Sequence, residues 1–169
     1  MKVILYMAVT TDGFIAKKDD DTAWVSDVDW KIFTKTVKDS GCIVMGRRTY
    51  EVSGGDFPYK GAFNIVMTKD LKLESSNNDV VFTNESPREV IKLAQDKGYQ
   101  KLLIIGGGSV NGSFMKERLI DEVFIDVHPF VFGTGIKVFE SFEGDVKLEL
   151  VDSKNLDKGQ VLLHYKVLK

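Results

Sequence analysis

The sequence has little cysteine and proline and no long apolar run, and each shortage excludes a class of protein. Its 169 residues include one cysteine, Cys42, so no disulfide can form within the chain. The three prolines stand singly and form no proline-rich linker. The apolar run at residues 3–9 is too short to cross a bilayer, which takes about 20 residues, and no cleavage site follows it. We therefore expect a cytoplasmic protein with no membrane segment.

An excess of charge of one sign is also lacking. Lys and Arg number 23 and Asp and Glu 25, which gives a formal net charge of −2. A protein that binds nucleic acid through its phosphates needs a basic excess. The balance therefore argues against nucleic acid and for a small molecule as the partner. With 43% apolar residues the chain can bury a core without disulfides, so we expect one domain over residues 1–169.

Short β-branched segments alternate with helical ones. The predicted strands are 3–9, 42–45, 64–68, 80–82, 101–105 and 122–127. Several are apolar on both faces, which is typical of a mostly parallel sheet covered by helices on each side. Helices are predicted after Ser26, Gly46, Ser86 and Gly108. Residues 147–153 and 160–168 are predicted to form an antiparallel hairpin, so the fold class is α/β with a mixed sheet.

A glycine-rich junction at residues 104–110 could hold a pyrophosphate. An apolar strand ends there in three glycines, and a helical segment, 111–119, follows. Glycine lets backbone N–H groups approach a ligand closely, and a helix N-terminus adds partial positive charge. The alternative is a tight turn without a ligand.

A second junction adds two cations. Arg47, Arg48 and Thr49 follow the strand that ends at Gly46. Helix N-termini disfavour cations, so paired arginines there suggest a bound phosphate; the alternative is pairing with nearby Asp or Glu. Residues 67–69 end another strand with a hydroxyl and a lysine. Ligands of open α/β sheets gather at the carboxyl ends of strands, so we expect these turns to converge.

Two aspartates are candidates for acid chemistry. Asp29 shares a helix face with Phe33, which would set a carboxylate beside an aromatic wall. Asp29 also stands where a capping-box acid would bind the backbone at Ser26, and spacing leaves both roles open. Asp126 lies in an apolar strand beside Phe124, where it either lines a cleft or is solvated.

No metal site is predicted. His128 and His164 stand at no metal-ligand spacing from each other or from Cys42, and Cys42 itself is expected in the core rather than as a nucleophile.

Taken in order, these segments resemble the dihydrofolate reductase superfamily, especially the branch named for the C-terminal reductase domain of bacterial riboflavin biosynthesis. The motifs are Ala8-Val9-Thr10-Thr11-Asp12-Gly13-Phe14-Ile15-Ala16, Trp24 with Asp29, Met45-Gly46-Arg47-Arg48-Thr49-Tyr50, Ile105-Gly106-Gly107-Gly108, Leu119-Ile120-Asp121-Glu122 and His128-Pro129-Phe130-Val131-Phe132-Gly133-Thr134-Gly135. The resemblance covers most of the chain. It implies a dihydrofolate reductase-like three-layer fold and a homodimer.

The resemblance also implies NADP as cofactor and a cis peptide between Gly106 and Gly107. The residues that it assigns to the cofactor are Ala8, Ile15, Gly46, Arg47, Arg48, Thr49, Thr68, Lys69, Ile105, Gly107, Gly108, Ser109 and Val110. Among them, Thr68 and Lys69 match the adenosine 2′-phosphate side. Asp29 matches the carboxylate that holds the substrate ring and helps a proton reach it, and Phe33 and Trp24 match substrate-side aromatics.

Three departures from the family pattern bear on the substrate. Ala62 stands where an arginine clamps folate, Asp126 replaces the threonine that partners the acid, and residues 54–58 lack the Asp-Asp-Pro of the riboflavin pathway enzyme. Two neighbouring carboxylates, Asp29 and Asp126, would raise one pKa. We expect an NADPH-dependent reductase of a small pterin- or pyrimidine-like heterocycle. The alternatives are a non-catalytic nucleotide-binding dimeric module and the riboflavin-pathway pyrimidine reductase itself.

Overall fold

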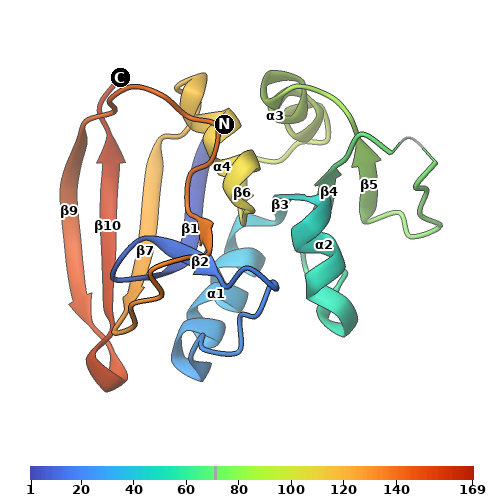
Figure 1. Ribbon diagram of the computed structural model, residues 1–169. Coiled ribbons are helices and arrows are strands. Elements are labelled where there is room, and N and C mark those ends of the chain that lie inside the picture. The colour runs from blue at the N-terminus through green and yellow to red at the C-terminus, as the bar shows by residue number, and fades with distance from the viewer. Residues whose placement is uncertain (71) are drawn as a thin grey trace.

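A computed structural model describes residues 1–70 and 72–169, and within them the chain forms a central eight-stranded sheet (Figure 1). The strand order is β5-β4-β3-β6-β1-β7-β10-β9. These strands are β1 (Lys2–Thr10), β3 (Cys42–Gly46), β4 (Phe63–Met67), β5 (Val80–Thr83), β6 (Lys101–Ile104), β7 (Glu122–His128), β9 (Leu148–Asn155) and β10 (Val161–Val167). The helices are α1 (Asp27–Ser40), α2 (Arg47–Ser53), α3 (Pro87–Asp96) and α4 (Gly108–Lys116), with 3-10 turns at Gly54–Asp56 and Asp157–Gly159.

The sheet is mixed and mostly parallel, as predicted. β1 pairs in parallel with β6 and β7, and β3 pairs in parallel with β4 and β6. β10 runs antiparallel to β7 and to β9, which confirms the C-terminal hairpin. The carboxyl ends of β3, β4 and β6 therefore lie at one edge of the sheet, where α2 and α4 begin.

Two apolar layers enclose the sheet. Along β3, Cys42 and Val44 face the layer that contains residues of α3 and α4, whereas Ile43 and Met45 face the layer that contains Val37 of α1. All four strand side chains are fully buried. Successive side chains of β3 thus pack into opposite layers. Both faces of the strand are buried, which is why residues 42–45 are all apolar.

The helices begin at the predicted polar residues. The Ser26 hydroxyl accepts a hydrogen bond from the Asp29 backbone N–H (3.1 Å) at the start of α1, which ends at Gly41 in the left-handed conformation. Ser86 and Glu89 form a complete capping box at α3. α4 begins at Gly108, three residues before the predicted 111, because Gly107 is extended and already serves as its N-cap.

Two short strands were not predicted. β2 (Phe14–Ala16) and β8 (Ile136–Lys137) pair in a separate two-stranded sheet beside β1. Within the described residues no helix is long and apolar enough to span a bilayer.

Candidate active site

The two strand-to-helix junctions lie against each other. The Gly46 N–H donates to the Gly106 carbonyl oxygen (2.8 Å), and a Cβ added to Gly46 would come within 3.1 Å of Val110. The peptide between Gly106 and Gly107 is cis, as the resemblance implied. The predicted convergence of the glycine and arginine turns is therefore correct, since β3 and β6 are neighbours in the sheet.

A cavity of about 430 Å³ opens over these junctions. The residues predicted for a cofactor that line it are Ile15, Gly46, Arg47, Arg48, Thr49, Ile105, Gly107, Gly108, Ser109 and Val110. Ala8 does not line it; the neighbouring Met7 does, because successive side chains of β1 point to opposite faces. Ala16, Tyr59 and Glu140 also line the cavity and were not predicted.

A second cavity of about 460 Å³ continues the first. It contains Thr68 and Lys69, and it shares Arg47, Ser109 and Val110 with the first cavity. The ends of β3, β4 and β6 thus border one extended cleft. Ile15 lines the first of these cavities and Lys69 the second.

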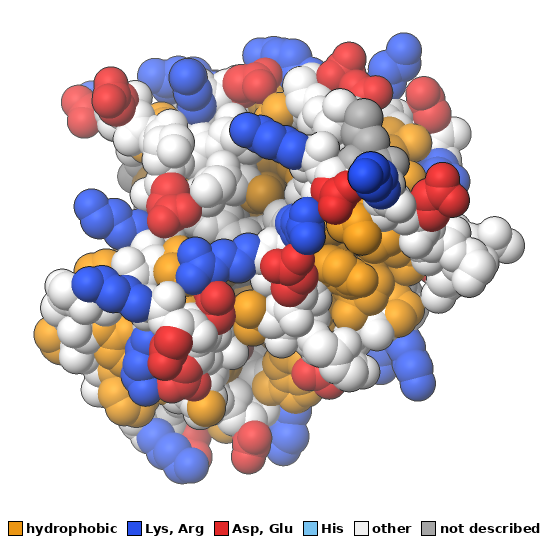
Figure 2. Space-filling view, turned by 45° about the vertical axis from the view of Figure 1, so that its right-hand side comes forward, with side chains coloured by type: hydrophobic (Ala, Val, Ile, Leu, Met, Phe, Trp, Pro, Cys, Tyr) orange, Lys and Arg blue, Asp and Glu red, His pale blue; other side chains and the backbone are white. Residues whose placement is uncertain are grey.

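Both arginines are paired with carboxylates. Arg47 Nε lies 2.7 Å from Glu51 Oε1 and its Nη1 lies 3.1 Å from Asp70, whereas Arg48 Nε lies 2.5 Å from Asp20. The ion pairs with Asp and Glu that the sequence offered as the alternative to a bound phosphate are therefore present. Arg47 and Arg48 also line the cleft. Figure 2 shows the wider pattern, with Lys and Arg interspersed among Asp and Glu rather than gathered in one basic patch.

The helix N-termini at the cleft carry no side-chain cap. Gly46 caps α2 and Gly107 caps α4, and neither can supply a capping oxygen. Helix N–H groups without a side-chain cap, glycine backbone and nearby guanidinium groups are the donor set that a pyrophosphate needs, so these residues fit a dinucleotide. Glu140 is the exception, because its carboxylate accepts a hydrogen bond from Ser109 Oγ (2.9 Å) in the first turn of α4.

Asp29 is buried and does not act as a cap. Its side chain is 3% exposed, and its Oδ1 accepts a hydrogen bond from the Tyr6 hydroxyl (2.7 Å). The Ser26 N–H, which a capping-box acid would bind, donates instead to His128 Nε2 (3.3 Å). The capping alternative for the Asp29 carboxylate is therefore wrong; only the Asp29 backbone takes part in the cap. Burial and the Asp29 carboxylate raise the pKa of Tyr6.

Asp126 is fully buried, so the solvated alternative is wrong. It pairs in register with Ala8 of β1 and is 0% exposed, and no donor in the described residues bonds to either carboxyl oxygen. Burial raises the pKa of Asp126 to about 7, with a further upward contribution from the Asp29 carboxyl group. The raised pKa that two neighbouring carboxylates predict is therefore found on Asp126.

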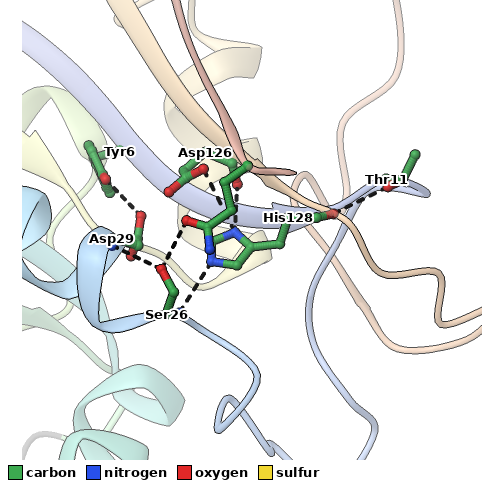
Figure 3. A network of polar contacts seen from close by, with 7 residues as sticks. Tyr6, Thr11, Ser26, Asp29, Asp126 and His128 are labelled. Carbon is green, nitrogen blue, oxygen red and sulfur yellow. Dashed lines mark hydrogen bonds and ion pairs between the residues drawn. The ribbon is translucent and has the colours of Figure 1, made fainter. Parts of the chain in front are cut away.

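A polar network joins the start of α1 to β7 and to Gln160, the residue before β10 (Figure 3). The Ser26 hydroxyl donates to Gln160 Oε1 (2.9 Å), and His128 Nδ1 lies 3.2 Å from the Asp126 carbonyl oxygen. Since His128 Nε2 accepts from the Ser26 N–H, Nδ1 must carry the ring hydrogen. The network fixes the N-terminal turn of α1, and with it the Asp29 carboxylate.

Aromatic rings lie between the acids and the cleft. The Phe33 ring packs on Tyr6 (5.9 Å between centroids) and on Tyr59 (5.4 Å), and Tyr59 lines the cleft. Trp24 lies elsewhere and packs edge-on against His128 (5.0 Å). Asp29, Asp126, Phe33 and Trp24 do not line the two cavities themselves.

Sequence reasoning missed Tyr6 and did not assign His128 a partner. Tyr6 lies in an apolar strand, where a tyrosine is indistinguishable from a core residue without knowledge of what faces its hydroxyl. The sequence offered one signal for Tyr6. It stands two residues before Ala8, the first residue of the first motif, and therefore lies on the same strand face as Ala8.

The remaining candidates behave as core residues. Cys42 is fully buried, and burial raises the pKa of its thiol to about 12. Within residues 1–70 and 72–169, no three His, Cys, Asp or Glu side chains group so as to hold a metal ion.

Comparison with known proteins supports this architecture. A family model described as the RibD C-terminal domain matches residues 1–162. The uncharacterized Bacillus subtilis protein YwjB is 35% identical over 174 residues, which cover 97% of each chain. Both the dihydrofolate reductase-like fold and the resemblance to the riboflavin-biosynthesis branch are confirmed.

Two solved structures share the fold at low sequence identity. One is the Thermotoga maritima diaminohydroxyphosphoribosylaminopyrimidine deaminase/5-amino-6-(5-phosphoribosylamino)uracil reductase, with a TM-score of 0.82 at 19% identity over 99% of this chain and 56% of that one. The other is a pyrimidine reductase-like protein of Corynebacterium diphtheriae, with a TM-score of 0.83 at 13% identity over 99% and 92%.

Proposed function

The chain belongs to the RibD C-terminal domain family, and from that premise we propose that it is an NADPH-dependent reductase of a small pterin- or pyrimidine-like heterocycle. The observation that carries the proposal is the hydrogen bond between the Gly46 N–H and the Gly106 carbonyl (2.8 Å), which joins two uncapped helix N-termini in one cleft. A bound NADPH would supply the hydride for such a reaction.

The residues of the cleft would hold the cofactor along its length. The N–H groups of Gly107 and Gly108 would bind the pyrophosphate, and Arg47 would exchange a carboxylate partner for a phosphate. Thr68 and Lys69 would face the 2′-phosphate that distinguishes NADP from NAD. Glu140 would turn away from Ser109 as the anion arrives, because the Glu140 carboxylate and a phosphate group both carry negative charge.

On the substrate side, Asp29 is the proposed catalytic residue. A buried carboxylate on the first helix would accept hydrogen bonds from the ring and direct a proton to the nitrogen that hydride addition leaves negative. Phe33 would supply an apolar wall for the ring, in contact with Tyr59 of the cleft. Ala62, where a folate-clamping arginine is expected, is buried and apolar, which favours a substrate without the folate tail.

The riboflavin-pathway pyrimidine reductase is the second candidate. It is favoured by the family match and by the name of the T. maritima relative. Activity on the phosphorylated ribosylaminopyrimidine, measured beside a panel of unphosphorylated pterins and pyrimidines, distinguishes the two candidates.

The cofactor proposal predicts a preference that binding measurements can test. NADPH should bind much more tightly than NADH in calorimetric titrations. Lys69→Gln should weaken NADPH binding about tenfold and leave NADH binding unchanged, since about 1.4 kcal/mol of a charged contact to phosphate is removed. Lys72→Gln, at an exposed lysine outside the cleft, is the control. Equal affinities of the wild-type chain for the two cofactors would contradict the assignment of Lys69.

A second copy of the chain is the proposed partner, in addition to the small heterocycle. β9 forms one edge of the sheet, and every residue along it is exposed, including Leu148, Leu150 and Val151. Exposed apolar side chains on an unpaired edge favour association between copies.

A further inference from the structure

We propose that Asp126 is a proton-holding residue that shares one proton with Asp29 and delivers it, through Asp29, to the substrate nitrogen. The delivery step rests on the proposed function, whereas the shared proton is a property of the chain alone.

The first support is that Asp126 has no donor. Its side chain is 0% exposed, and neither carboxyl oxygen accepts a hydrogen bond from any N–H or O–H of the described residues. A buried carboxylate without donors is strongly unfavourable. Asp126 pairs with Ala8 and therefore shares a sheet face with Tyr6. The Tyr6 hydroxyl bonds to Asp29, so the Asp29 carboxyl is the polar group on this face. Two carboxyl groups form a hydrogen bond only when one of them is protonated.

The second support is that the described neighbours supply no positive charge. Besides the two acids themselves, the titratable groups that face the pair are Tyr6 from β1 and His128 from β7. His128 Nδ1 lies 3.8 Å from Asp126 Oδ1, too far for a hydrogen bond, and it is directed to the Asp126 carbonyl oxygen. Because Nε2 accepts from the Ser26 N–H, the imidazole is neutral in this geometry.

Tyr6 determines which of the two acids holds the proton. Its hydroxyl donates to Asp29 Oδ1 (2.7 Å), which stabilises the charged form of Asp29, whereas Asp126 receives no such bond. The proton therefore resides on Asp126, which donates to Asp29. The pKa of Asp126, raised to about 7 by burial and by Asp29, agrees with a proton retained near neutral pH.

The proposed step is balanced. A bound NADPH would supply the hydride and would itself be oxidised; the substrate would gain a C–H bond at the ring carbon of a C=N bond, and the π electrons of that bond would move to the nitrogen. Asp29, which begins without a proton, takes the proton of Asp126 and passes it to the nitrogen, where an N–H bond forms as the Asp126 O–H bond breaks. The pair is left with two negative charges, and water restores the proton after the product leaves.

The shared proton can be tested without substrate or cofactor. Infrared spectra of the chain, with aspartate labelled by ¹³C, should contain a protonated-carboxyl band that titrates near pH 7. Asp126→Asn should remove this band, whereas Asp96→Asn, at an exposed aspartate of α3, should retain it. Tyr6→Phe should move the titration to higher pH, because Asp29 loses its donor. Absence of the band from the wild-type spectrum, or its persistence in Asp126→Asn, would overturn the proposal.

The delivery step has its own readout. Asp126→Asn can still donate a hydrogen bond to Asp29 but releases no proton, so kcat should fall about 100-fold with little change in KM or in NADPH affinity. The pH profile of kcat should lose its limb near pH 7, and Asp126→Glu should recover part of the activity. An unchanged pH profile in a folded Asp126→Asn chain would refute delivery. A wild-type chain without reductase activity would overturn the proposed function and the delivery step together, and the infrared result would still decide the shared proton.

Discussion

At the scale of single residues, a buried acid without a donor makes the folded state sensitive to pH. The folded chain holds the Asp126 proton up to about pH 7, whereas the unfolded chain releases it near the ordinary pKa of 3.8. Between these values the folded state binds more protons than the unfolded state. The free energy of unfolding therefore falls as pH rises through this window, by up to about 1.4 kcal/mol per pH unit, and levels off above it.

Asp126→Asn should remove this dependence. The variant should gain stability relative to the wild-type chain as pH rises from about 5 to 8, because Asn carries no charge to be desolvated. Urea unfolding at the two pH values measures the difference. Asp96→Asn serves as the control, and a difference between Asp126→Asn and wild type that is the same at both pH values would refute the explanation.

The sequence predicted part of the site at this scale. Asp29 was identified from its helix face and from the family resemblance, Arg47, Arg48 and Thr49 from a strand-to-helix junction, and Thr68 and Lys69 from the end of a strand. Tyr6 could not be found, since its role depends on a side chain 23 residues away that the chain topology brings to its hydroxyl. Glu140 was missed for the same reason: it approaches α4 from a segment without a motif.

At the scale of elements, two glycines of α4 admit a neighbouring chain segment. A Cβ on Gly108 would lie 2.3 Å from the Lys137 carbonyl oxygen, and one on Gly112 would lie 1.8 Å from the Glu140 carbonyl oxygen. Both glycines are buried and lie one turn apart, so they form a flat strip against which residues 137–140 pack. These nearest atoms belong to the backbone, which cannot move away from an added Cβ as the end of a flexible side chain can.

Gly112→Ala should therefore destabilise the chain by about 1–3 kcal/mol through overpacking. This loss is reduced by the preference of a helix interior for alanine over glycine, which is about 1 kcal/mol. Urea unfolding monitored by circular dichroism measures the loss. Gly55→Ala is the matched control, because a Cβ there meets nothing within 4 Å. If both variants unfold at the wild-type urea concentration, the close approach of residues 137–140 does not limit stability.

The predicted elements match the structure where periodicity and caps are strong. α1 and α3 were predicted from Ser26 and Ser86, and the six β-branched runs all became strands. β2 and β8 have three and two residues, which are too few to show the alternation of apolar and polar residues that predicts a strand. Their pairing depends on Gly135, where a Cβ would lie 2.5 Å from the Ala16 carbonyl oxygen, and a sequence does not reveal which segment stands opposite a glycine.

At the scale of the whole molecule, the sheet ends in an open apolar edge. β5 borders one side, and β9, with eight exposed residues, borders the other (Figure 1). Leu150 pairs with Tyr165 of β10, so its side chain extends the apolar face of the hairpin. Leu148, Leu150 and Val151 favour an interface here, while Glu149, Asp152 and Lys154 place charges along the same strand.

Leu150→Lys should reduce self-association, since a lysine amine is strongly hydrated and would be buried between copies. Analytical ultracentrifugation over a range of concentrations should give a dimer for the wild-type chain and a shift toward monomer for the variant. Val131→Lys replaces a side chain that is 74% exposed outside β9 and should leave the mass unchanged. A monomeric wild-type chain would contradict the proposed homodimer.

The bond between Ser26 and Gln160 joins the beginning of the first helix to the residue that precedes the last strand. The C-terminal hairpin therefore stabilises the N-terminal turn of α1 and also forms one edge of the sheet. Deleting residues 160–169 would remove a support of the Asp29 carboxylate, so an early stop in this chain would impair its chemistry as well as its architecture.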